Sequence, residues 1–336
     1  MLKNLTDTLG KATPARKKEL FLGRRLVPLL ISGLIIYYYA RRVNWTELSD
    51  AVLSANLLLF IPARFIPLFI YLLVDSYLLK LLLDWFHQPI SFRRMVYPRA
   101  ALYLLALIHI QFSNGGMFLY LMRASGIKAE KLAGMVVFRF AWSVWSINFG
   151  LTLALLATRL FGWKFHSPLG LELILLGIGI IWASLFICLG LVYYHHRYKP
   201  GAYHRPLWSI FFEARPRQYL EVAGWTLMLA VIGVINNYLC AISFGVRIPI
   251  HELVVQLPIA ELIAAVPIAF AGLGATTFAW QTLFKPYATP AMFLSLTIAL
   301  PVTTYLARAI FALFALPRAT KDIQDAFSSN SSSESQ

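Results

Sequence analysis

Eight long apolar segments, separated by short stretches rich in Arg and Lys, constrain this chain more than any other feature of its sequence. A lipid hydrocarbon core about 30 Å thick is crossed by roughly 20 helical residues, and most of the segments reach that length. They cover residues 26–40, 57–83, 100–122, 132–157, 169–194, 219–245, 253–284 and 291–316. Because 59% of the residues are apolar and only 13% are charged, lipid rather than water is the expected solvent. The sequence predicts an all-α polytopic integral membrane protein, since helices satisfy their own backbone in lipid.

Glycine interrupts the third apolar segment of each group of four. The first interruption is Ser113-Asn114-Gly115-Gly116, and the second is Ala271-Gly272-Leu273-Gly274, which follows Pro258 and Pro267. Glycine and proline release backbone groups that lipid cannot satisfy, so broken backbone should lie within protein or line a wet cavity. We therefore expect each broken segment to fold into a re-entrant helical hairpin, with half-helices starting at about 115 and 274.

Each half would contain three crossings and one hairpin. Because three is an odd number, the second half would start on the opposite side of the membrane from the first, and the two halves would be inverted repeats. The first repeat would cover residues 26–158 and the second 159–317. A basic cytoplasmic arm, 1–25, would precede them, and a disordered polar tail, 318–336, would follow. Broken segments at matching places in inverted halves are typical of the binding sites of secondary transporters.

The basic residues support this topology. With both termini cytoplasmic, 20 of the 30 Lys and Arg residues fall in inner segments and six in outer segments, while four lie within spans. An excess of Lys and Arg in cytoplasmic loops is the usual pattern of membrane proteins. The net charge of +15 is therefore interpreted as topology rather than as a nucleic-acid-binding surface. A model in which both broken segments cross the membrane is disfavoured by several loops and stays open.

Charged residues inside apolar segments need a partner or a purpose, because each costs about 2.5–3.5 kcal/mol at the bilayer centre. Arg64 and Asp75 are eleven residues apart in one segment, which places them on nearly the same helix face and about 16 Å apart. They would either line one inward surface around an anionic headgroup or each pair with a neighbouring helix. Lys80 and Asp84 have the spacing of an i,i+4 ion pair.

Three further charged residues are candidates for the same inward surface. Glu261, in the first arm of the second hairpin, would either exchange protons or pair with Arg64, Arg139 or Arg308. Arg139 and Arg308 each lie in the last crossing of their half, towards the inner leaflet. They would either hold a phosphate through bidentate hydrogen bonds or extend to the inner headgroups.

Polar and small residues beside the two breaks complete the candidate site. In the first hairpin these are Asn114, Gly115 and Gly116, and in the second they are Gly272, Gly274 and Thr276. The free N–H groups at the start of a half-helix favour an anion. Asn236-Asn237, within the segment 219–245, is interpreted either as interhelical hydrogen bonding or as part of the site lining.

Motifs for catalysis or metal binding are lacking. The only close Asp pair, Asp322-x-x-Asp325, lies in the polar tail, and no Gly-x-Ser-x-Gly or phosphate-binding glycine loop occurs. His251-Glu252 begins like a zinc-protease motif but is not followed by the second His. The two cysteines, Cys188 and Cys240, lie in separate apolar segments. We expect no enzyme, no cofactor and no metal site.

Several short motifs give the chain a resemblance to a known family. They are Gly115-Gly116, the stretch from Tyr120 to Ile127, Val136-Val137-Phe138-Arg139, and Gly272-Leu273-Gly274. Over roughly residues 26–316 the chain resembles the transmembrane, flippase-like domain of bacterial lysylphosphatidylglycerol synthases and related stand-alone membrane proteins. The chain differs from the family pattern at Ala275-Thr276-Thr277, where Arg-Glu is usual, and at Trp142, where Asp is frequent.

The resemblance implies movement of lipid between leaflets, in a stand-alone member without the synthase domain. Our first hypothesis is thus a bacterial inner-membrane translocase for an anionic phospholipid or a polyprenyl-phosphate-linked lipid. The alternative is a non-transporting scaffold for a cell-envelope enzyme that makes lipid or glycan. A cofactor-free membrane transferase is the third hypothesis.

Overall fold

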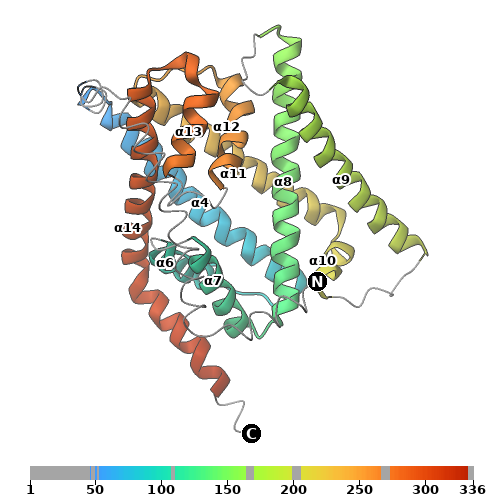
Figure 1. Cartoon of the computed structure of the whole chain (residues 1–336). Coiled ribbons are helices and arrows are strands. Elements are labelled where there is room, and N and C mark those ends of the chain that lie inside the picture. Colours follow the sequence, from blue (N-terminus) through green and yellow to red (C-terminus); the bar gives the residue numbers. More distant parts are fainter. Residues whose placement is uncertain are drawn as a thin grey trace, which may run out of the picture.

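The computed structural model describes residues 46, 50, 53–106, 110–163, 170–198, 206–265 and 273–331. Every regular element within these ranges is a helix (Figure 1). Five of the helices are long and apolar enough to cross a membrane. They are α4 (Leu57–Phe86), α8 (Ala129–Leu160), α9 (Leu171–Tyr198), α11 (Pro216–Ser243) and α14 (Pro290–Ser331). The predicted all-α membrane fold is confirmed, and the segment 26–40 lies outside the described residues.

Local sequence signals define where several of these helices begin and end. Asn56 caps α4, since its side-chain oxygen accepts a hydrogen bond from the backbone N–H of Leu59 at 3.1 Å. Pro216 occupies the first turn of α11, where a missing N–H costs nothing. Gly245 follows the end of α11 with φ +75°, a backbone conformation that residues with a Cβ atom rarely adopt. These signals mark the start of α4 and both ends of α11.

The region of the first predicted hairpin contains three short helices. α5 (Arg93–Ala101) and α6 (Tyr103–Ala106) precede α7 (Ile110–Ser125), and residues 107–109 lie outside the described ranges. α7 contacts both α5 and α6.

The predicted break at Gly115-Gly116 is wrong. Both glycines lie inside α7, which begins at Ile110 rather than at 115. A Cβ atom on Gly116 would lie 2.8 Å from Cδ2 of Leu102 and 3.3 Å from Cδ1 of Leu105. Gly116 therefore permits close packing of α7 against the segment before it, and no chain break is needed to explain it.

The second interrupted segment divides where the sequence indicated. α12 (Ile250–Ala265) and α13 (Leu273–Leu283) contact each other, and residues 266–272 between them are not described. α13 covers most of the predicted half-helix, and the half-helix start at about 274 stays a prediction. A turn of 3₁₀ helix, Lys285–Tyr287, follows α13.

The two sets of short helices lie towards opposite ends of the molecule (Figure 1). α12 and α13 lie beside the start of α4 and of α14, whereas α6 and α7 lie nearer the opposite end. Inverted halves would give this arrangement. Inverted repeats and re-entrant hairpins remain predictions.

Two large apolar clusters hold the helices together. One joins α7, α8, α10 (Pro206–Glu213) and the end of α4, with Phe138 fully buried at its centre. Ring centroids of Phe138 and Phe211 lie 5.2 Å apart in an edge-to-face arrangement. The other cluster joins α11, α12, α13 and α14 around Phe284 and Phe293.

The end of α14 differs from the predicted disordered tail 318–336. α14 continues to Ser331, and only 332–336 lie beyond the described ranges. The extension is anchored on α5, because Ala319 is fully buried and a guanidinium nitrogen of Arg318 donates to the hydroxyl of Tyr97. These contacts stabilise the helix at residues 318 and 319, where the sequence alone predicted a disordered tail.

Candidate anion-binding cavity

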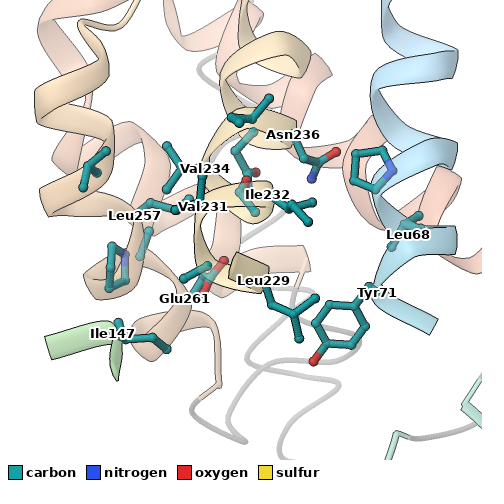
Figure 2. Close-up of a pocket in the computed structure, with 18 of the residues that line it drawn as sticks. Leu68, Tyr71, Ile147, Leu229, Val231, Ile232, Val234, Asn236, Leu257 and Glu261 are labelled. Carbon is teal, nitrogen blue, oxygen red and sulfur yellow. Dashed lines mark hydrogen bonds between the residues drawn. The ribbon is translucent and has the colours of Figure 1, made fainter. Parts of the chain in front are cut away.

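A cavity of about 780 Å³ lies between six helices: α4, α8, α11, α12, α13 and α14. Its walls are largely apolar, and Figure 2 shows Ile147, Leu229 and Leu257 among the residues that line it. Figure 2 also shows Tyr71 and Glu261 towards one end of the pocket and Asn236 towards the other. A mostly apolar wall with a few polar groups is typical of ligand-binding pockets.

Five of the residues predicted from sequence line this cavity. Arg64, Arg139, Glu261, Thr276 and Arg308 come from five different helices and from both halves of the chain. These residues are far apart in the sequence, and the fold brings them to one shared inward surface. Their convergence makes this cavity the candidate site.

Arg64 is held by neutral groups of two neighbouring helices. Its Nη2 atom donates to the carbonyl oxygen of Leu300 at 3.1 Å and to the hydroxyl of Thr304. We orient the amide of Asn236 so that its nitrogen donates to the carbonyl of Ala63 at 2.7 Å and its oxygen accepts from Nη1 of Arg64 at 2.8 Å. The buried Nε atom of Arg64 has no acceptor among the described residues. Neutral acceptors position the guanidinium but leave its charge uncompensated.

Asp75 lies behind the cavity wall and joins three helices. Its Oδ2 atom accepts from Nε of Arg99 on α5 at 2.7 Å, and its Oδ1 atom accepts from Nη2 of Arg139 on α8. The side chain of Asp75 is only 3% exposed. Of the two interpretations of Asp75, the structure favours pairing with neighbouring helices. Arg139 contacts this carboxylate and also faces the cavity.

Arg308 lies over the ring of Tyr103, 5.5 Å from the ring centroid. Arg99 lies 5.8 Å from the same centroid. These contacts are cation–π interactions, which hold a guanidinium without neutralising it. Neither Arg308 nor Arg64 forms an ion pair within the part of the chain that the structure describes. The cavity thus has two cationic side chains without an acidic partner.

Glu261 is the one acidic side chain among the described residues of the cavity lining. It extends from α12 and is exposed to the open space (Figure 2). It makes no ion pair with Arg64, Arg139 or Arg308. The predicted pairing of Glu261 with one of these arginines is therefore wrong in this structure.

The other predicted site residues lie away from the cavity lining or outside the described ranges. Asn114 accepts a hydrogen bond from Nη1 of Arg99 at 3.1 Å and so connects α7 to the Asp75 cluster. Gly115 and Gly116 lie within α7, and Gly274 lies in the first turn of α13. Gly272 lies outside the described residues.

The sequence prediction missed several polar residues of the site. Arg99 was assigned to a cytoplasmic loop, because it immediately precedes an apolar segment. Tyr71, Thr304 and Tyr305 also line the cavity, but isolated hydroxyl groups in apolar helices give little signal by themselves. Lys80 and Asp84 form the predicted i,i+4 ion pair, outside the cavity lining.

Comparison with known proteins gives one family. No curated protein and no solved structure matches the chain. A family model described as the lysylphosphatidylglycerol synthase TM region matches residues 25–312, which include every charged residue of the cavity. The match covers most of the chain and agrees with the five apolar helices of membrane-spanning length. The chain is therefore a multi-pass membrane protein that belongs to the lysylphosphatidylglycerol synthase transmembrane-region family.

Proposed function

We propose that this protein moves an anionic, phosphate-bearing lipid between the leaflets of the bacterial inner membrane. The headgroup would pass through the cavity between the two halves while the acyl or polyprenyl chains stay in the lipid. One observation carries the proposal. Arg64 and Arg308, which lie in helices of membrane-spanning length, face one cavity, and neither has an acidic partner among the described residues. An uncompensated guanidinium in a poorly hydrated site favours an anionic ligand.

The geometry of the arginines suits a phosphate group. Arg308 lies one helical turn beyond Thr304, the residue that binds Arg64, so both guanidinium groups lie near the same level of α14. Guanidinium groups bind phosphate oxygens through pairs of parallel hydrogen bonds. Arg139, bound to Asp75 at the cavity wall, would supply a third contact. No covalent chemistry by the protein is part of this proposal.

The topology of the proposal keeps both termini cytoplasmic and treats α12–α13 as a re-entrant hairpin. α12 and α13 pack against each other, which supports entry and exit on one side. Two inverted halves would let the cavity open alternately to the two leaflets. Transporters built from inverted repeats place their sites at the interface of the repeats.

Lipid exchange in reconstituted vesicles tests the function. The probe is phosphatidylglycerol with a fluorophore on one acyl chain, and an impermeant reductant bleaches the probe in the outer leaflet. The wild-type protein should make nearly all of the probe accessible, whereas protein-free vesicles protect the inner half. Arg308→Gln should slow exchange about tenfold or more, because a hydrogen bond to a charged group contributes about 1.5–3 kcal/mol.

Arg159→Gln provides the matched control. Arg159 is exposed at the end of α8 and does not line the cavity, so exchange should be unchanged. Wild-type vesicles with no exchange of this probe, or of a polyprenyl phosphate, would reject the translocase. Recovery of one cell-envelope enzyme in fixed ratio, together with absent exchange, would instead favour the scaffold.

A further inference from the structure

Glu261 is an acidic side chain in a cavity that otherwise suits an anion. Every charged side chain besides Glu261 among the described cavity-lining residues is an arginine. Glu261 makes no hydrogen bond or ion pair within the described part of the chain, although three arginines line the same cavity. A carboxylate placed there repels an anionic headgroup, and a neutral carboxylic acid does not.

The groups around Glu261 can be named helix by helix. α12 packs against α8, α11 and α13. Among the described lining residues, α8 contributes Arg139, while α11 and α13 contribute no titratable side chain. Across the cavity, α4 contributes Arg64 and Tyr71, and α14 contributes Tyr305 and Arg308. Glu261 is therefore the one carboxyl group of this lining that can gain or lose a proton as the headgroup enters.

We propose that Glu261 is a proton-binding site that couples lipid movement to a proton gradient, one proton with each anionic headgroup. This inference rests on the proposed function. A proton from water on the entry side binds the Glu261 carboxylate, and the headgroup then occupies the cavity beside a neutral acid. After the cavity opens to the other leaflet, the headgroup leaves and Glu261 releases the proton to water on that side.

The coupling follows from linkage between the two ligands. If proton binding strengthens headgroup binding, headgroup binding must strengthen proton binding by the same factor. A headgroup with one negative charge then crosses together with one proton, and no net charge crosses the membrane. One pH unit corresponds to about 1.4 kcal/mol, so it would support up to about a tenfold difference in lipid between the leaflets.

A pH gradient across the reconstituted vesicles tests this inference. With the same phosphatidylglycerol probe, the outside is held one pH unit more acidic than the inside. Protons would run inwards, so wild-type protein should enrich the probe in the inner leaflet, up to about tenfold. Glu261→Gln resembles the protonated acid and should exchange the probe without enrichment. Glu172→Gln, an exposed acid in the first turn of α9, should behave as wild type.

The possible outcomes separate this inference from the proposed function. Exchange by wild-type protein without any response to the pH gradient would overturn the coupling and leave the translocase intact. Full enrichment by Glu261→Gln would overturn the assignment of Glu261. Enrichment driven by a potassium diffusion potential, in the absence of a pH gradient, would overturn the one-proton stoichiometry. Absence of exchange in every protein would reject both proposals.

Discussion

The Nε atom of Arg99 lies 2.7 Å from Oδ2 of Asp75, and this ion pair joins the short helix α5 to the middle of α4. Arg139 binds the other oxygen of the same carboxylate from α8. Arg99 also donates to Asn114 on α7. One buried carboxylate thus connects the cavity wall, through Arg139, to the helices of the first interrupted segment.

Asp75→Asn should destabilise the protein by about 3–5 kcal/mol, because it leaves two arginines without their shared anion at a buried site. The expected result is a clear fall in the thermal unfolding temperature in detergent. Asp84→Asn is the matched control, since Asp84 also pairs with a basic residue on α4 but is 22% exposed. That change should cost about 1 kcal/mol or less. Equal losses for the two variants would contradict a special role for Asp75.

Apolar length and charge were sufficient to predict most of the fold. The segments that became α4, α8, α9, α11 and α14 could be identified because a membrane span is a local property of the sequence. Searching the apolar segments for charge also identified Arg64, Arg139 and Arg308 in these helices and Glu261 in α12, and the structure places all four around one cavity. These predictions did not depend on which helices are neighbours in the fold.

The structure differs from the sequence prediction where tertiary contacts determine the local conformation. A glycine at position 116 is compatible either with a break in the helix or with close packing of the helix against a neighbouring segment. Only the position of Leu102 in the structure distinguishes the two. From the sequence alone, Arg99 resembles a loop residue. The structure places it beside Asp75, which is 24 positions earlier in the chain. α14 continues into the polar residues after 317, where Arg318 donates to the hydroxyl of Tyr97 on α5 and Ala319 is buried.

Gly115 and Gly116 form a matched pair within α7. A Cβ atom on Gly115 meets nothing within 4 Å, so Gly115→Ala should stabilise the protein by about 0.5–1 kcal/mol. Gly116→Ala gains the same helix preference but must displace the side chain of Leu102, at about 0.5–1.5 kcal/mol. Gly116→Ala should therefore unfold at a lower temperature than Gly115→Ala. The reverse order would mean that α7 does not pack on Leu102.

Asn236→Asp would give Arg64 the acidic partner that it lacks. The change keeps nearly the same shape, and its new carboxylate would lie within reach of Nη1 of Arg64. If uncompensated charge attracts the headgroup, phosphatidylglycerol exchange should fall while the unfolding temperature is maintained. Asn236→Ala removes the positioning contact without adding charge, and it should slow exchange less. Undiminished exchange by Asn236→Asp would count against Arg64 as a headgroup contact.

The sidedness of the second hairpin is the remaining test of the inverted arrangement. Lys285 lies just after α13 and Arg123 near the end of α7, and both are exposed. If both interrupted segments are re-entrant, Lys285 faces the outside and Arg123 the cytoplasm. Single cysteines at these positions, with Cys188 and Cys240 replaced by Ala, would report this through an impermeant maleimide applied to intact cells. Lys285→Cys should be labelled at once, and Arg123→Cys only after the membrane is opened. Labelling of both from one side would contradict opposite placement of the hairpins, since no odd number of crossings would then separate them.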